Sequence, residues 1–181
     1  MRVSQSKQAV ILGLLLVAVI GITVISGAYY VVVPSRSEAL RVFVEYGREP
    51  TEAVTEDMQM DPLIVARGDV VPDVLAAVAA SSMPKRRYAI AFLGNSGRRE
   101  AIPLLERILR NEHEEPLFRG DALDAIAMID AGRSRQLAPE FSARSDYLGS
   151  VARDLMTGVW RSRRSYSTAL RAFLCVRLTG C

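Results

Sequence analysis

The chain has 181 residues, half of them hydrophobic, with 23 Lys or Arg against 20 Asp or Glu and a formal net charge of +3. The length suits one domain with one additional segment, and the apolar content is high for a small soluble domain. No nucleic-acid partner, no small-molecule substrate and no cofactor is expected.

Much of the apolar content lies in residues 9–33, which contain no charged side chain. As a helix rising about 1.5 Å per residue, the segment reaches roughly 37 Å, enough to span a hydrocarbon core of about 30 Å. A cleavable signal peptide is the alternative, because residues 26–28 are small. The length and the two tyrosines that follow favour an uncleaved transmembrane anchor.

The cytoplasmic tail predicted for residues 1–8 contains Arg2 and Lys7 but no acid. A short acid-free tail before a long C-terminal domain favours a single-pass protein of the bacterial inner membrane, with the domain outside the cytoplasm. The orientation stays open, because arginines also follow the span. Arg outnumbers Lys 21 to 2, as is typical of a GC-rich bacterial genome.

Residues 34–60 are predicted to form an amphipathic helix followed by an acidic connector. The charge is unevenly distributed, with a net −6 over residues 45–73 and a net +5 over residues 151–181. The basic end could meet an anionic partner or lipid headgroups. We favour the alternative, in which its arginines form the solvated face of amphipathic helices.

Residues 61–146 contain a repeated pattern of a small residue, an apolar residue and a proline that opens an apolar helix. The prolines are Pro72, Pro103 and Pro139, spaced 31 and 36 residues apart. Each follows a glycine-containing turn, at Gly68, Gly97 and Gly132. A period of this length, built from paired helices, predicts an α-solenoid.

A second register supports the same period. Arg86, Ala89 and Leu93 recur 33 residues later as Arg119, Ala122 and Ile126. A small and a large residue on one helical face allow a neighbouring helix to approach closely, so these six positions, together with Pro103 and Asp124, are predicted to stack the repeats. The predicted core consists of Phe92, Leu93, Leu104, Leu105, Ile108, Leu109, Leu123, Ile126 and Ile129.

The stretch RRYAIAFLGNSGRREAIPLLERIL, residues 86–109, resembles the short HEAT-like repeat of the phycobilin lyases. That unit runs roughly Arg-x-x-Ala-x-x-x-Leu-Gly, a turn with Gly, then Ala-x-Pro-x-Leu. The next unit keeps the pattern but has Ala127 where the family has Gly. The resemblance implies an all-α solenoid of helix pairs, and residues 147–181 are expected to cap it as terminal helices.

Few residues suggest chemistry. His113, the only histidine, lies in an acidic connector that we interpret as a solvated loop. Asp121 is expected to serve the N-terminal end of its helix, and Asp124 to pair with Arg86 or Arg87 of the preceding unit. Trp160 could be a membrane or partner anchor, or a residue that covers the last repeat.

The two cysteines, Cys175 and Cys181, lie at the end of the chain. Outside the cytoplasm they would form a small disulfide. A pair with this spacing and no nearby histidine is a poor metal site, so no metal is expected.

The sequence therefore predicts a non-enzymatic, membrane-anchored scaffold that binds a protein partner of unknown identity. Second helices starting at Val71, Ile102 and Ala138 are expected to line the binding side, with Glu106, Arg107 and Arg110 in contact with the partner. One alternative is an accessory enzyme or lyase-like protein related to the phycobilin lyases. Another is a small structural subunit of a larger membrane complex.

Overall fold

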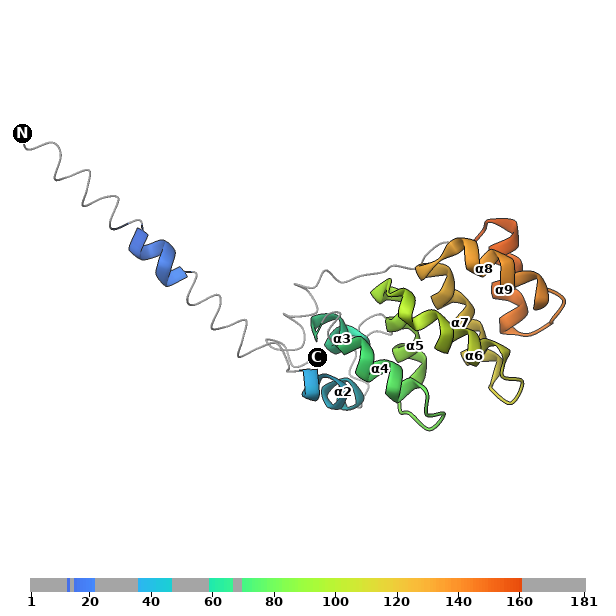
Figure 1. The fold of residues 1–181 in the computed structure, drawn as a ribbon, viewed down its shortest axis with the longest axis horizontal. Helices are drawn as coiled ribbons and strands as arrows, with labels where there is room; N and C mark the ends of the chain where they lie inside the picture. Colours follow the sequence, from blue (N-terminus) through green and yellow to red (C-terminus); the bar gives the residue numbers. More distant parts are fainter. Residues whose placement is uncertain (1–12, 14, 22–35, 47–58, 67–69, 161–181) are drawn as a thin grey trace, which may run out of the picture. The chain divides into compact units, whose positions relative to one another are not determined.

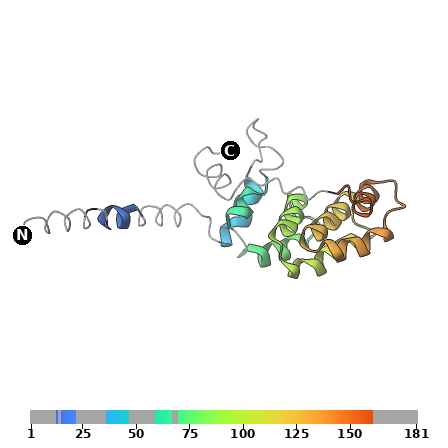
Figure 2. The same ribbon diagram turned by 90° about the horizontal axis from the view of Figure 1, so that it is seen from above.

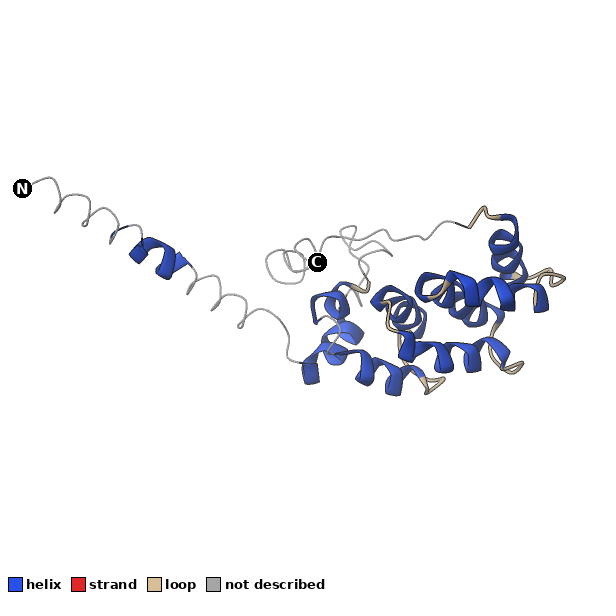
Figure 3. Ribbon diagram, turned by 45° about the horizontal axis from the view of Figure 1, so that its top comes forward, coloured by secondary structure: helices blue, strands red, loops and turns tan. Residues whose placement is uncertain are grey.

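The computed structural model describes residues 13, 15–21, 36–46, 59–66 and 70–160, and the chain divides into two units, residues 1–33 and 34–181. Throughout the described part the regular structure is helical, with no strand (Figures 1 and 3). The predicted all-α class is therefore confirmed.

In the first unit, residues 15–21 are helical and expose large apolar side chains, among them Leu15, Leu16 and Val17. Across the described ranges, no helix is both long and apolar enough to cross a bilayer. Most of the predicted span, residues 9–33, lies outside those ranges, as does the tail over residues 1–8. The membrane anchor stays a prediction.

The second unit begins with α2 (Arg36–Glu45), α3 (Asp61–Ala66) and α4 (Val71–Val78). Helix α2 buries Ala39 and Phe43, one turn apart, and packs against α3. This is the amphipathic helix predicted within residues 34–60, whereas residues 47–58 of the acidic connector, and Gly68, lie outside the described residues.

The best-matched repeat folds as the sequence predicts. Helix α5 (Arg86–Ser96) ends at Gly97, whose φ of 64° is a left-handed conformation that glycine adopts without strain. A single 3-10 turn (Arg99–Ala101) leads into α6 (Ile102–Arg110), with Pro103 in its first turn. Proline is favoured there because the first turn of a helix needs no backbone N–H donor.

Helix α7 (Pro116–Ile129) is the centre of the unit and packs against α5, α6, α8 and α9. Figure 2 shows two rows of helices, one with α5, α7 and α9 and the other with α4, α6 and α8. Because α7 has neighbours on several sides, residues of almost every helical face are buried, from Arg119 through Ala127.

The third predicted pair differs from expectation. Gly132 was expected in a turn and Pro139 at the start of a helix, but α8 spans Ala131–Leu137, and residues Ala138–Glu140 form a 3-10 turn. The cause is Asp130, whose carboxylate accepts a hydrogen bond from the Arg133 N–H at 3.0 Å and so caps a helix that starts earlier. The prediction of a second helix starting at Ala138 is wrong.

Helix α9 (Tyr147–Thr157) ends the described helices. Its inner face buries Leu148, Val151, Ala152 and Leu155, whereas Ser150, Arg153, Asp154 and Thr157 are exposed on the other side. Helix α9 also exposes Tyr147 and Met156, so it has only part of the polar outer face that a terminal capping helix requires. The second capping helix expected within residues 147–181, together with Cys175 and Cys181, lies outside the described residues.

The predicted core is confirmed. Eight of its nine residues are buried, and Ile129 is partly buried against the same cluster. The stacking positions Ala89, Leu93, Ala122 and Ile126 are each fully buried, in α5 and α7, which pack against each other. Trp160 also packs against this core, which favours its role as a covering residue.

Gly94 brings α5 and α7 together at their closest point. A Cβ atom added there would lie 2.7 Å from Ala125 Cα and 2.9 Å from Ala125 Cβ. We expect Gly94→Ala to lower the free energy of unfolding by about 1–3 kcal/mol, because backbone atoms must move apart. Gly132→Ala is the control, since its nearest atom is 3.3 Å away in a side chain. Denaturant unfolding measures both; equal effects would contradict the close-approach account.

Candidate functional site

At two places in the described part of the chain, a buried arginine near the start of one helix contacts the end of the preceding helix. Arg86 Nε donates to the Val78 carbonyl at 2.9 Å, and Arg119 Nε donates to the Leu109 carbonyl at 2.8 Å. The two arginines are 4% and 5% exposed. The last carbonyls of a helix have no partner within it and carry partial negative charge, so a guanidinium there satisfies both needs.

Each of these arginines also lies near an aromatic ring further along the chain. The Arg86 guanidinium carbon is 5.4 Å from the Phe118 ring centroid, and that of Arg119 is 5.8 Å from the centroid of Phe141. Arg86 also forms an ion pair with Glu114 at 2.6 Å, so this carboxylate in the connector between α6 and α7 is part of the packed structure. The sequence predicts Arg86 and Arg119 as stacking positions, but only the structure identifies their partners.

Lys85 makes a comparable contact with α2. Its Nζ donates to the Phe43 carbonyl at 3.1 Å, to the Tyr46 carbonyl and to the Gln59 side chain at 2.6 Å. Lys85 has a φ of 55°, which is uncommon for a residue other than glycine. Burial lowers the pKa of its ammonium group. Sequence analysis missed this residue; its only signal is its position directly before Arg86.

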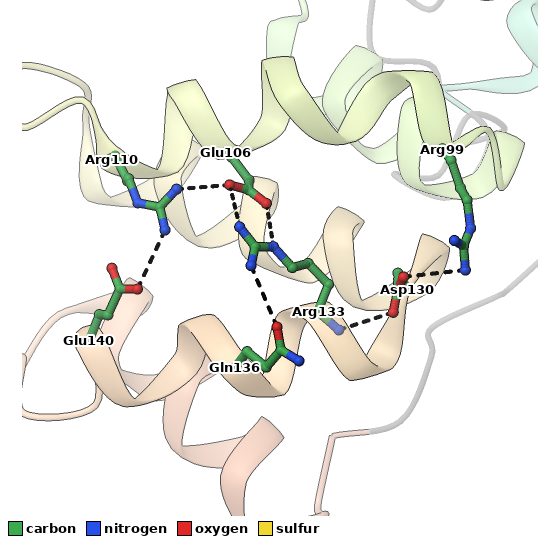
Figure 4. Close-up of polar contacts among 7 residues, drawn as sticks. All are labelled: Arg99, Glu106, Arg110, Asp130, Arg133, Gln136 and Glu140. Carbon is green, nitrogen blue, oxygen red and sulfur yellow. Dashed lines mark hydrogen bonds and ion pairs between the residues drawn. The ribbon is translucent and has the colours of Figure 1, made fainter.

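A polar network covers α6 and α8, and we call it the α6–α8 face (Figure 4). At its centre, Glu106 accepts two hydrogen bonds from Arg133, at 2.5 and 2.9 Å, and one from Arg110 at 2.8 Å. The Arg133 hydrogen bonds hold the pKa of Glu106 below its usual range, and Arg110 adds to the effect. We define the face as the bonded residues Glu106, Arg110, Arg133, Gln136 and Glu140, together with the exposed Arg107 and Arg135 of the same two helices.

Further contacts extend this network along the same side. Arg110 reaches Glu140 at 3.4 Å, and Arg99 reaches Asp130 at 3.3 Å, so ion pairs join the C-terminal end of α6, and the turn before α6, to the α8 region (Figure 4). These contacts link neighbouring helix pairs. They are partly exposed, and each contributes on the order of 0.2–1 kcal/mol.

The three residues predicted for partner contact have different positions on this face. Glu106 is 16% exposed and accepts hydrogen bonds from two arginines, so its role in this structure is to hold their side chains in place. Arg110 is 45% exposed, and Arg107 is exposed. Only the two arginines present much of their side chains to solvent, and partner contact by any of the three stays a prediction.

A second cluster lies where α5, α7 and α9 meet. Asp121 accepts from Arg87 Nε at 3.1 Å and from the Tyr147 hydroxyl at 3.2 Å, while Asp124 accepts from the Trp160 indole N–H. Asp121 lies inside α7, beyond its first turn, so its predicted role at the helix N-terminus is wrong. The expected Arg–Asp contact between units involves Arg87 and Asp121.

Burial raises the pKa of Asp121 to about 6, against the opposing effect of Arg87. The neighbouring Asp124 raises it further. The same burial raises the pKa of Tyr147 to about 12. A carboxyl group that titrates near neutral pH is a candidate for acid–base catalysis, but Asp121 lies at an interface between packed helices.

His113 lies exposed in the connector between α6 and α7. Its backbone N–H donates to the Asn111 side chain at 3.1 Å, a local turn contact. Within the ranges that the structure describes, no group of three or more His, Cys, Asp or Glu side chains could hold a metal ion. The connector over residues 111–115 is a structural loop in which Glu114 pairs with Arg86.

No known family model, curated protein or solved structure matches this chain. The fold class therefore stands on the helices themselves, and the HEAT-like resemblance stays a prediction from the sequence.

Replacing a buried arginine should lower the free energy of unfolding more than replacing an exposed one. We expect Arg119→Met to lower the free energy of unfolding by about 2–3 kcal/mol, because the Leu109 carbonyl loses a charged donor in a buried site. Arg110→Met, the matched control on the exposed face, should cost less than about 1 kcal/mol. Chemical denaturation measures the difference; similar values would mean that Arg119 does not hold the helix end.

Glu106 and Arg133 should be energetically coupled. A double-mutant cycle with Glu106→Gln and Arg133→Gln should give a coupling energy of about 0.5–1.5 kcal/mol that shrinks in 1 M salt. Because the folded pKa of Glu106 is lowered, the coupling is present above the usual value of 4.5 and is lost as the pH falls through the folded value. A coupling energy near zero at neutral pH would show that the ion pair is absent in solution.

Proposed function

We propose that the protein is a non-catalytic, membrane-anchored scaffold whose short α-solenoid binds another protein through the α6–α8 face. The observation that carries the proposal is that α6 and α8 expose more charged and polar side chains than α5 and α7 do. Helices α5 and α7 bury most of their residues, whereas α6, α8 and the turn after α8 expose Arg107, Arg110, Arg135, Gln136 and Glu140.

The chemistry of the α6–α8 face supports a protein partner. Arg107 and Arg135 are exposed, while the carboxylate of Glu106 is already shared between two arginines. Arginine is enriched in protein interfaces, because its stem covers apolar surface and its planar head binds carboxylates with two hydrogen bonds. The face would therefore suit a partner that presents carboxylates.

Rigidity is the second support for a binding role. The ion pairs among Glu106, Arg110, Arg133 and Glu140 fix the two helices and their side chains before any partner arrives. A preformed surface loses less conformational entropy on binding than a flexible one. Affinity in this proposal comes from surface contact on a fixed scaffold, without a chemical step.

The non-catalytic part of the proposal rests on how the reactive groups are used. Glu114, Asp121 and Asp130 each take part in an ion pair or a helix cap, and His113 is exposed in a loop. The membrane part rests on the sequence of residues 9–33, which carries no charge over a length sufficient to span a bilayer.

Site-specific photo-crosslinking in cells tests the binding face directly. The photoreactive residue is placed at Arg107 or Gln136 on the α6–α8 face, and at Ser150 or Thr157 on the outer face of α9 as matched controls. All four positions are exposed. We expect one protein partner to crosslink at the first two positions and not at the last two, because the contact is specific to one side.

A double variant then measures the contribution of the arginines. Arg107→Ala with Arg135→Ala should reduce the captured partner about tenfold, which corresponds to 1.4 kcal/mol of binding free energy. Ser150→Glu with Thr157→Glu changes the net charge by the same amount and should leave the capture unchanged. Capture lost equally in both variants, or a turnover activity that depends on His113, would contradict the proposal.

A further inference from the structure

The cluster around Asp121 joins three helices through one buried carboxyl group. Asp121 lies on α7, Arg87 on α5 and Tyr147 on α9, with contacts of 3.1 and 3.2 Å. The Asp121 side chain is 10% exposed, whereas that of Arg87 is 38% exposed. The carboxyl group is thus withdrawn from water while its cationic partner Arg87 is still partly solvated.

The backbone is shaped to bring Tyr147 onto this position. A Cβ atom added at Gly120 would lie 2.5 and 2.6 Å from two ring carbons of Tyr147. Only a glycine at residue 120 allows the ring to rest on α7 and cover the neighbouring Asp121. The aromatic cover is therefore part of how α9 is attached to the rest of the unit.

Three charged or titratable groups of the described residues face Asp121. Arg87 approaches from α5, Tyr147 from α9, and Asp124 lies one turn further along α7. Asp124 itself accepts a hydrogen bond from the Trp160 indole, which follows α9. Two carboxyl groups one turn apart, largely removed from water and both touching the α9 region, are costly to ionise together.

We propose that Asp121 is a pH-sensitive clasp, whose protonation tightens the attachment of α9 and Trp160 to α5 and α7 and whose ionisation loosens it. The device is independent of what the α6–α8 face binds. It would control how much of α9 and of the covered surface of α7 becomes accessible, over a range of mildly acidic to neutral pH.

The direction follows from proton linkage. The folded pKa of Asp121 is about 6, against an ordinary value of 3.8, so the closed state binds more protons than the opened state between these values. The closed state is therefore favoured in mild acid, and it loses this advantage as the pH rises through about 6. Between pH 5 and pH 7 the opening equilibrium constant of α9 should rise about tenfold.

Hydrogen exchange of the full chain tests the clasp. Amide exchange in α9 is compared with that in α6 of the same sample, after correction for the intrinsic pH dependence of exchange. We expect α9 opening to increase about tenfold from pH 5 to pH 7 relative to α6. In Asp121→Asn, which is neutral at every pH and matches the protonated form in size, this increase should disappear.

Two further variants make the outcome specific. Asp154→Asn, on the exposed face of α9, removes a carboxyl group outside the clasp and should keep the wild-type pH profile. Tyr147→Phe removes the hydroxyl donor that favours the ionised carboxylate and should move the midpoint to higher pH. The proposal is overturned if Asp121→Asn retains the wild-type slope, if Tyr147→Phe leaves the midpoint unchanged, or if α9 exchange slows as the pH rises.

Discussion

The buried contact between an arginine and the carbonyl end of the preceding helix is the constraint on which the rest of the structure depends. A guanidinium that is only 4–5% exposed must keep its hydrogen bonds, because an unpaired buried charge costs several kcal/mol. Arg86 and Arg119 meet that requirement only when α4 ends beside α5 and α6 ends beside α7. The contact therefore fixes where each helix pair lies against the next.

The surface follows from this arrangement. With α7 held among four neighbours, its side chains become core, and α6 and α8 are left with one face each to solvent. Glu106 on α6 then lies within reach of Arg133 on α8, and the ion pairs of the α6–α8 face form between the two helices. The same packing withdraws Asp121 from water and shifts its pKa. Both the binding proposal and the clasp are consequences of one packing scheme.

Local signals in the sequence predict the parts of the fold that local chemistry determines. The helix starts near Pro72 and Pro103, the stop at Gly97 and the apolar core positions all depend on propensity and periodicity within one element. The third pair escaped prediction because two local rules conflict there. Asp130 caps a helix that includes Gly132, and this cap outweighs the turn preference of glycine.

Contacts between distant residues could not be predicted in the same way. Arg86 and Arg119 are recognisable as repeated positions, but the carbonyl that each one binds becomes visible only when the helices are placed. Lys85 is not part of the repeated sequence pattern. Trp160 donates a hydrogen bond to Asp124, which lies 36 residues earlier in the chain. The candidate face shows the same limit, since Glu106 looks exposed in the sequence and proves to be held by two arginines.

The most direct test of this account is the exchange of the arginine Nε protons, measured by side-chain NMR on the full chain. If Arg86 and Arg119 hold the helix ends, their Nε protons should exchange with water slower by roughly tenfold or more than the Nε proton of exposed Arg107. Exchange of all three at the same rate would mean that the buried contacts do not persist in solution, and would contradict the claim that Arg86 and Arg119 hold the helix ends.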